Sequence, residues 1–140
     1  ANAEAYRSNA TVYIDRLRAL DTEIAAALNP FAGAAVIAYH DLLPYFARRY
    51  GLEIAAVVQP VPEVNPSPKR IANLRRVVRE KKVKALLVEP NARSPLAERL
   101  AKEFGIPLVE FESLETGASL PAAYELAMRR NAEALKRALW

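Results

Sequence analysis

Side chains that can bind a metal ion follow several apolar segments of this chain. His40, the only histidine, comes directly after the apolar run 34–39, and Glu89 follows another such run. Glu110 and Glu112 lie at the end of a further one. Imidazole nitrogen and carboxylate oxygen are common ligands of zinc, and carboxylates also suit manganese. These residue types indicate a site for a divalent transition metal.

These side chains can meet if the segments before them are neighbouring parallel strands. The sequence predicts strands at 34–39, 52–58, 83–88 and 107–111. It predicts helices at 42–50, 68–81, 94–104 and 122–139, with Ser67 as a helix N-cap and Pro68 at the first helical position. Alternation of this kind predicts an α/β fold with a four-stranded parallel sheet flanked by helices.

The carboxyl ends of parallel strands lie side by side, and open α/β sheets bind ligands there. One of the acids can therefore approach His40, with Gln59 as a further polar residue at a strand end. The competing interpretation is that Glu89 holds a loop or helix start, while Glu110 and Glu112 are solvated.

A long helix precedes the alternating part of the chain. Its apolar residues recur at steps of three, four or seven: Tyr6, Tyr13, Leu17, Leu20, Ile24 and Leu28. Asn29-Pro30 ends it. Because no strand precedes this helix, we expect residues 1–29 to be a connecting helix region and residues 30–140 to be an α/β lobe. We also expect the stripe from Tyr6 to Leu28 to be buried.

Composition excludes several classes of function. A chain of 140 residues with 52% hydrophobic residues fits one domain. The absence of cysteine excludes disulfides, cysteine-ligated zinc and thiol catalysis. No Gly-x-Ser-x-Gly elbow and no glycine-rich phosphate loop is present, so we do not expect an enzyme. No apolar run approaches the ~20 residues of a membrane span.

Positive charge is concentrated in one stretch, although the net charge is only +4. The basic residues are Lys69, Arg70, Arg75, Arg76, Arg79, Lys81, Lys82 and Lys84. Such a cluster can contact phosphates. The stretch has no interleaved aromatic residues and no nucleic-acid motif, which favours the solvated face of an amphipathic helix. We therefore expect no nucleic-acid partner.

Short motifs occur in a fixed order along the chain. They are Val-Ile-Ala-Tyr-His-Asp at 36–41 with Tyr45-Phe46 after it, Asn-Pro-Ser-Pro at 65–68, Val-Glu-Pro-Asn at 88–91, Val-Glu-Phe-Glu-Ser-Leu at 109–114, and Tyr124-x-x-x-Met128-x-x-Asn131. Together they resemble the metal-binding solute-binding proteins of bacterial ABC importers, the zinc and manganese receptors. The motifs cover nearly the whole chain, so the resemblance is specific although each motif is short.

The resemblance implies two α/β lobes joined by one long helix, with the metal between the lobes. It places His40 on the third ligand and Glu112 on the fourth, where the family usually has aspartate. Two further histidines would come from an N-terminal lobe. The chain is similar to the C-terminal lobe alone, for which weak zinc or manganese binding, or none, is expected. Histidine at the third position favours zinc.

The same resemblance implies a periplasmic or extracytoplasmic, membrane-associated location. The implied partners are the membrane permease of the importer and the missing N-terminal lobe. The face that would pack on that lobe could also drive self-association.

Two other functional classes remain open at this point. A stand-alone flavodoxin-like enzyme or signalling domain would use the carboxylates at the strand ends. It would need a phosphate-binding loop or an acidic cluster after the first strand, where Asp41 is the single acid. A nucleic-acid-binding helix over residues 69–84 is the third and most distant interpretation.

Overall fold

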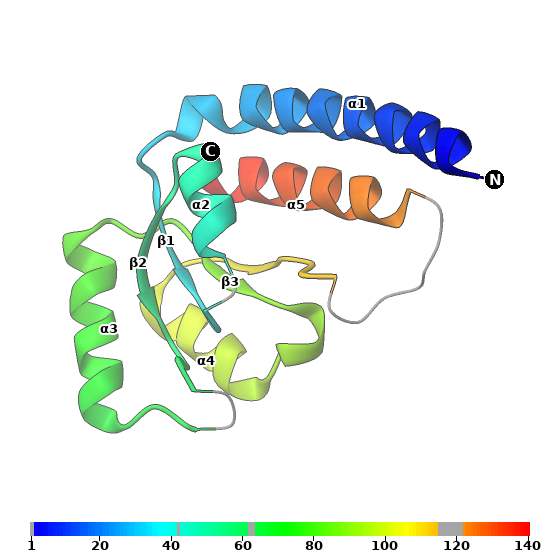
Figure 1. Ribbon diagram of the computed structural model, residues 1–140. Coiled ribbons are helices and arrows are strands. Elements are labelled where there is room, and N and C mark those ends of the chain that lie inside the picture. Colours follow the sequence, from blue (N-terminus) through cyan, green and yellow to red (C-terminus); the bar gives the residue numbers. More distant parts are fainter. Residues whose placement is uncertain (1, 42, 62–63, 115–121) are drawn as a thin grey trace.

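The four predicted strands form one parallel sheet. The computed structural model describes residues 2–41, 43–61, 64–114 and 122–140 (Figure 1). The strands are β1 (Ala35–Ala38), β2 (Glu53–Val57), β3 (Leu86–Val88) and β4 (Leu108–Glu110). Their order across the sheet is β2-β1-β3-β4, and each neighbouring pair is parallel. The predicted fold class is confirmed.

Helices alternate with the strands as predicted. They are α1 (Ala3–Leu28), α2 (Pro44–Tyr50), α3 (Pro68–Glu80), α4 (Pro95–Phe104) and α5 (Ala123–Leu139), with short 3₁₀ turns at Asn29–Phe31 (η1) and Pro90–Ala92 (η2). The hydroxyls of Ser67 and Ser94 accept the backbone N–H of the third residue after each, capping α3 and α4. The predicted Ser67 cap and the first-turn proline of α3 are confirmed.

Element ends differ from the predicted ones for local reasons. The third strand begins at Leu86, three residues later than predicted. The N–H of Val83 donates to the Val78 carbonyl at 3.0 Å and closes the end of α3, and the N–H of Lys84 donates to Ala35 of β1 at 2.8 Å just before the strand begins. Gly51 and Gly105 end α2 and α4 in the left-handed conformation, with φ of 72° and 69°. Only glycine adopts that conformation without a steric cost. Residue 42, the predicted start of the second helix, lies outside the described residues.

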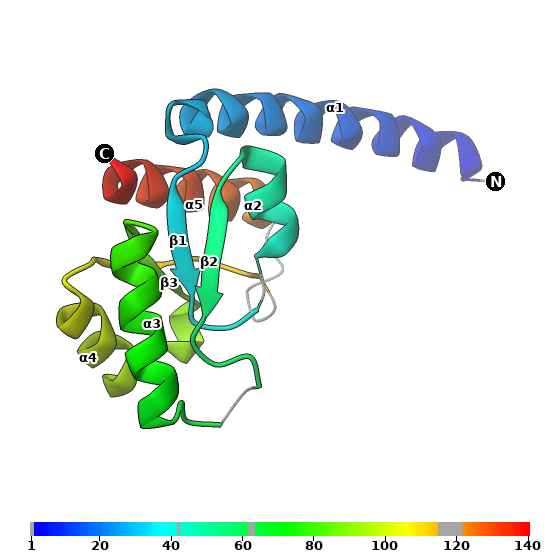
Figure 2. The same cartoon turned by 90° about the vertical axis from the view of Figure 1, so that its left-hand side faces the viewer.

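The sheet is covered on both faces. Helices α1, α2 and α5 pack against Val36 and Ala38 on one face, and α3 and α4 pack against Ala35 and Ile37 on the other (Figure 2). Successive side chains of a strand point to opposite faces, so each face receives every second residue of β1. All four residues of β1 are buried, as expected for a central parallel strand.

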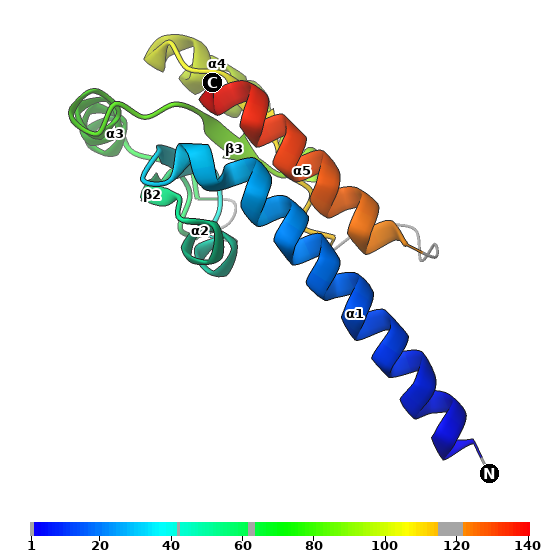
Figure 3. The ribbon, with the colours of Figure 1, turned by 90° about the horizontal axis from the view of Figure 1, so that it is seen from above.

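Only the C-terminal half of α1 belongs to this core. Leu20, Ile24 and Leu28 are buried, whereas Tyr6 and Tyr13 are 68% and 42% exposed. Figure 3 shows that α1 lies beside α5 and that its N-terminal end extends beyond it. The prediction that the whole stripe is buried was therefore wrong for its first half. Periodicity shows which residues share a helix face, but it does not show how far an opposing element reaches.

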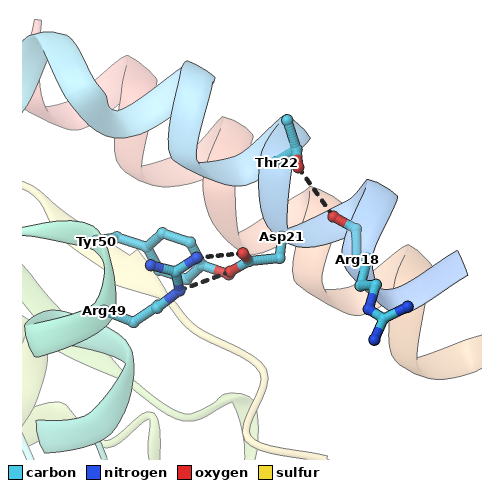
Figure 4. Close-up of polar contacts among 5 residues, drawn as sticks. All are labelled: Arg18, Asp21, Thr22, Arg49 and Tyr50. Carbon is cyan, nitrogen blue, oxygen red and sulfur yellow. Dashed lines mark hydrogen bonds and ion pairs between the residues drawn. The ribbon is translucent and has the colours of Figure 1, made fainter. Parts of the chain in front are cut away.

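Polar contacts fix the C-terminal half of α1 on its neighbours. Asp21 accepts hydrogen bonds from both Arg49, whose Nε is 2.8 Å away, and the Tyr50 hydroxyl at 3.1 Å (Figure 4). Arg16 of α1 forms an ion pair with Glu125 at the start of α5.

Within the described ranges, no helix combines the length and hydropathy needed to cross a bilayer.

The pKa values of Asp21 and Tyr50 are both shifted from their usual values. The hydrogen bond from Arg49 lowers the pKa of Asp21 below its usual value. The pKa of Tyr50 is raised to about 12, mainly by burial and to a smaller extent by the hydrogen bond to Asp21. The carboxylate form of Asp21 and the neutral phenol of Tyr50 are therefore the forms that stabilise this contact near neutral pH.

We predict that the two halves of α1 respond differently to truncation of a side chain. Leu28→Ala, at a position with no exposed surface, should lower the free energy of unfolding by about 2–5 kcal/mol. Tyr6→Ala should change it by less than about 0.5 kcal/mol, since surface substitutions are usually near neutral. Urea unfolding of both variants measures this. Equal losses would contradict the partial burial of α1.

We also predict that Asp21 contributes to stability only above acidic pH. Its folded pKa is lowered, so its contribution is complete above the unfolded value of about 3.9 and is lost as pH falls through the folded pKa. Asp21→Asn should be less stable than the unsubstituted chain at pH 7, and the difference should shrink towards about pH 2. Asp15→Asn, at an exposed position paired within α1, is the matched control. A difference independent of pH would contradict the prediction.

Candidate metal site

The polar residues predicted to gather at strand ends do lie at one edge of the sheet. Backbone hydrogen bonds continue past the strands: Gln59 N–H donates to Tyr39, Tyr39 N–H to Leu87, and Phe111 N–H to Val88, each at 2.8 Å. Extended by this register, residues 59, 40, 89 and 111 lie level with one another across β2, β1, β3 and β4, and Glu112 lies one residue further along. The edge is the carboxyl edge, where parallel sheets bind ligands.

His40 lies between two buried polar side chains. Its Nδ1 is 3.2 Å from Oε1 of Glu89, and its Nε2 is 3.1 Å from Oε1 of Gln59. Glu89 is 8% and Gln59 6% exposed, while the His40 side chain retains 20% exposure. The acid that approaches His40 is therefore Glu89, from the neighbouring strand β3. The imidazole is held on both sides and is still open to solvent.

Glu112 is fixed by an asparagine of α5. The Glu112 N–H donates to Oδ1 of Asn131 at 2.8 Å, and Nδ2 of Asn131 donates to the Glu112 carbonyl at 2.9 Å. The Glu112 carboxylate accepts the N–H of Leu114 at 3.0 Å. Asn131 is 2% exposed. Its amide thus replaces a missing strand partner for the backbone just beyond β4.

His40 and Glu112 border two adjoining hollows that have Leu43 and Phe111 in common. The first is narrow and is lined by His40 and Glu89 as well. The second, of about 340 Å³, includes Glu112 in its lining. Across the described parts of the chain, no cluster of three or more histidine or acidic side chains could hold a metal ion. These residues therefore offer nitrogen and oxygen donors at one edge without a complete coordination sphere.

The remaining charged candidates are engaged elsewhere. Glu110 pairs with Arg93 at 2.7 Å and is exposed, and hydrogen bonds from Arg93 to Glu110 and Glu98 raise the pKa of Arg93. In the basic stretch, Arg75 pairs with Glu103 and Lys81 with Glu53. Ion pairs of this kind fit the solvated-face interpretation of that stretch.

Sequence reasoning assigned no role to Asn131 or to Glu125, which is 4% exposed in its ion pair with Arg16. A signal was present for Asn131. It lies on the apolar face of the last helix, three residues after Met128, where a polar side chain needs a partner. Glu125 carried no such signal, because an acid in the first turn of a helix is common on exposed surfaces.

The family model for the periplasmic zinc-uptake complex component A matches residues 1–138. The chain belongs to this family. Zinc-binding protein AdcA of Streptococcus pyogenes serotype M3 is 35% identical over 138 residues, covering 96% of this chain and 27% of AdcA. The high-affinity zinc uptake system protein ZnuA of Bacillus subtilis is 30% identical over 143 residues, covering 99% of this chain and 44% of ZnuA.

Solved structures show the same relationship. The solute-binding protein FpvC of Pseudomonas aeruginosa in complex with Mn2+ has a TM-score of 0.84 and 33% identity, covering 99% of this chain and 51% of FpvC. A Zn(II)-bound mutant variant of AdcAII from Streptococcus pneumoniae has a TM-score of 0.81 and 25% identity, with 99% and 51% coverage. The chain thus spans between about a quarter and about half of these relatives and corresponds to a C-terminal half.

The resemblance inferred from the motifs is therefore confirmed. The relatives' names describe metal binding and uptake rather than catalysis. They give no support to a flavodoxin-like enzyme or signalling domain.

We predict that Asn131 holds Glu112 in place. Asn131→Ala leaves a backbone N–H and a carbonyl without their partner, which should lower the free energy of unfolding by about 1–3 kcal/mol. The amide hydrogen of Glu112 should exchange faster with solvent. Urea unfolding and hydrogen exchange measure the two effects. Arg130→Ala, at the exposed neighbouring position, is the control. Unchanged exchange at Glu112 would contradict this role.

Proposed function

We propose that this chain is the C-terminal lobe of an extracytoplasmic receptor that binds a divalent transition metal and delivers it to the membrane permease of an ABC importer. Zinc is favoured and manganese is the second candidate. The observation that carries the proposal is the solvent-accessible imidazole of His40 at the carboxyl edge of the sheet, in a chain of the zinc-uptake family.

His40 and Glu112 are the proposed ligands on this lobe. An imidazole nitrogen and a carboxylate oxygen match the donors that zinc takes in proteins. Glutamate is one methylene longer than the aspartate usual in the family. The two hydrogen bonds between Asn131 and the Glu112 backbone hold that backbone, so that only the side chain has to move. Two ligands make half of a site, so the other ligands would come from an N-terminal lobe.

Residues 1–29 are proposed as the connecting helix region and residues 30–140 as the lobe. The exposed apolar residues of the first half of α1 support this division: they are Tyr6, Val12, Tyr13 and Ile14. Apolar side chains on a projecting helix would be covered by a neighbouring lobe, or by a second copy of the chain if that lobe is missing.

The proposed location is periplasmic or otherwise extracytoplasmic and associated with the membrane. The family is described as periplasmic. A zinc-binding lipoprotein AdcA of Streptococcus pneumoniae serotype 4 is 33% identical over 138 residues. A lipid anchor of that kind would hold a receptor beside its permease.

We predict weak zinc binding by this chain through His40. Two protein ligands leave the other positions to water, so the dissociation constant should be about 1 μM or weaker by calorimetric titration. His40→Ala should abolish the heat of binding, and Glu112→Gln should reduce the affinity. Glu110→Gln, at an exposed acid on the same sheet edge, is the control and should bind as the unsubstituted chain does. Nanomolar affinity that survives His40→Ala would show that the ligands lie elsewhere.

The fold should not depend on metal. The core clusters on both faces of the sheet do not include His40 or Glu112, and a weak ligand adds little stability by mass action. Thermal melts with and without EDTA should therefore nearly coincide. Unfolding of the chain by the chelator would contradict the prediction, because metal would then organise the core.

A further inference from the structure

We propose that Glu89 is a positioning residue for His40. Its carboxylate accepts the Nδ1–H of the imidazole and leaves Nε2 as the nitrogen that binds metal, while Gln59 occupies Nε2 until metal replaces it. This inference rests on the proposed function, since it specifies how the lobe presents its histidine. It assigns distinct roles to the two side chains that touch His40.

Both the backbone and the side chain of Glu89 are fixed where it contacts His40. Glu89 lies at the end of β3, and its carbonyl accepts the N–H of Ala92 at 2.9 Å, which fixes its backbone in the turn that begins at Pro90. Its side chain is nearly buried, and His40 is its only hydrogen-bond partner among the residues that the structure describes. A buried carboxylate needs a partner, and an ionised one only accepts hydrogen bonds. Nδ1 therefore carries the proton of this contact.

The hydrogen bond between Gln59 and His40 is easier for a metal ion to replace than the one between Glu89 and His40. Gln59 is neutral, and its amide has a second partner in Oδ1 of Asn65 at 3.5 Å. Hydrogen bonds to a charged group are roughly twice as strong as those between neutral groups. With Nδ1 protonated and Nε2 unprotonated, the Gln59 amide is rotated by half a turn so that its NH2 donates to Nε2, and the Asn65 amide rotates with it so that it donates to Oε1 of Gln59. Metal arriving at His40 would displace Gln59 and leave the bond to Glu89 intact.

The arrangement has a chemical consequence for the metal. A histidine ligand whose second ring nitrogen donates to a carboxylate has a fixed ring orientation and a more basic ligating nitrogen, and loss of the carboxylate typically costs 10- to 100-fold in metal affinity. If Glu89 were itself a ligand, binding would break its hydrogen bond to Nδ1 and bring the metal to that side of the ring. The two roles therefore predict metal on different nitrogens.

The single histidine makes the test direct. A chain labelled with 15N-histidine has two imidazole nitrogen signals, both from His40. Zinc titration followed by NMR should show the metal-bound signal at Nε2 and a protonated Nδ1. Metal on Nδ1 would overturn the inference. No zinc-induced change at either nitrogen would overturn the proposed role of His40 as a ligand, and this inference with it.

Substitutions of Glu89 supply a second readout. Glu89→Leu should weaken zinc binding 10- to 100-fold and remove the preference for a proton on Nδ1, whereas Glu89→Gln, which keeps an acceptor, should restore most of the affinity. Gln59→Ala should bind zinc at least as tightly as the unsubstituted chain. Glu110→Gln is the matched control. Unchanged affinity in Glu89→Leu, with zinc still bound at His40, would overturn this inference alone.

Circular dichroism checks that each variant is folded. If Glu89→Leu does not fold, Glu89→Asp takes its place, because the shorter side chain keeps the charge but no longer reaches Nδ1. An aspartate variant with full affinity and the same nitrogen signals would overturn the positioning role.

Discussion

The hydrogen-bond ladder that holds β1 between β2 and β3 is the constraint on which the rest of the molecule depends. Every residue of β1 is buried, and backbone bonds run from it to strands on both sides. A buried strand cannot leave these groups unpaired, so its register with its neighbours is strongly specified. Because the bonds continue past the strands, His40 emerges between Gln59 and Glu89.

Both faces of the sheet are covered by helices, and the candidate site lies at the carboxyl edge between them. Helices α3 and α4 seal one face, and the other is covered by α2, α5 and the last part of α1. Helix α5 also supplies Asn131, whose amide fixes the backbone of Glu112 beyond the edge strand β4. Asp21 of α1 bonds to Arg49 of α2, and Arg16 of α1 pairs with Glu125 of α5. The projecting helix α1 is therefore fixed to two helices that lie next to the candidate site. The candidate site therefore lies beside two core clusters that do not include its proposed ligands, His40 and Glu112.

Much of this could be predicted from the sequence. Mostly apolar segments between amphipathic ones predict buried parallel strands because both faces of such a strand meet helices. Ser67 and Pro68 mark the start of α3 because capping and the fixed φ of proline act locally. The order of short motifs around His40, Glu89, Glu112 and Asn131 was sufficient to indicate the family. Each of these signals depends on neighbouring residues or on the order of segments along the chain.

The sequence by itself determined the alternation of elements, the Ser67 cap of α3 and the edge of the sheet that carries His40, because periodicity, capping and connection rules act over a few residues. Only the tertiary structure decided which acid touches His40. Glu89, Glu110 and Glu112 all lie at strand ends, but β3 is the neighbour of β1, so Glu89 lies beside the imidazole, while Glu110 on β4 pairs with Arg93. It also decided that Tyr6 and Tyr13 stay exposed while Leu20 and Leu28 are buried. Burial depends on where α5 and the sheet lie in space, and no pattern within α1 contains that information.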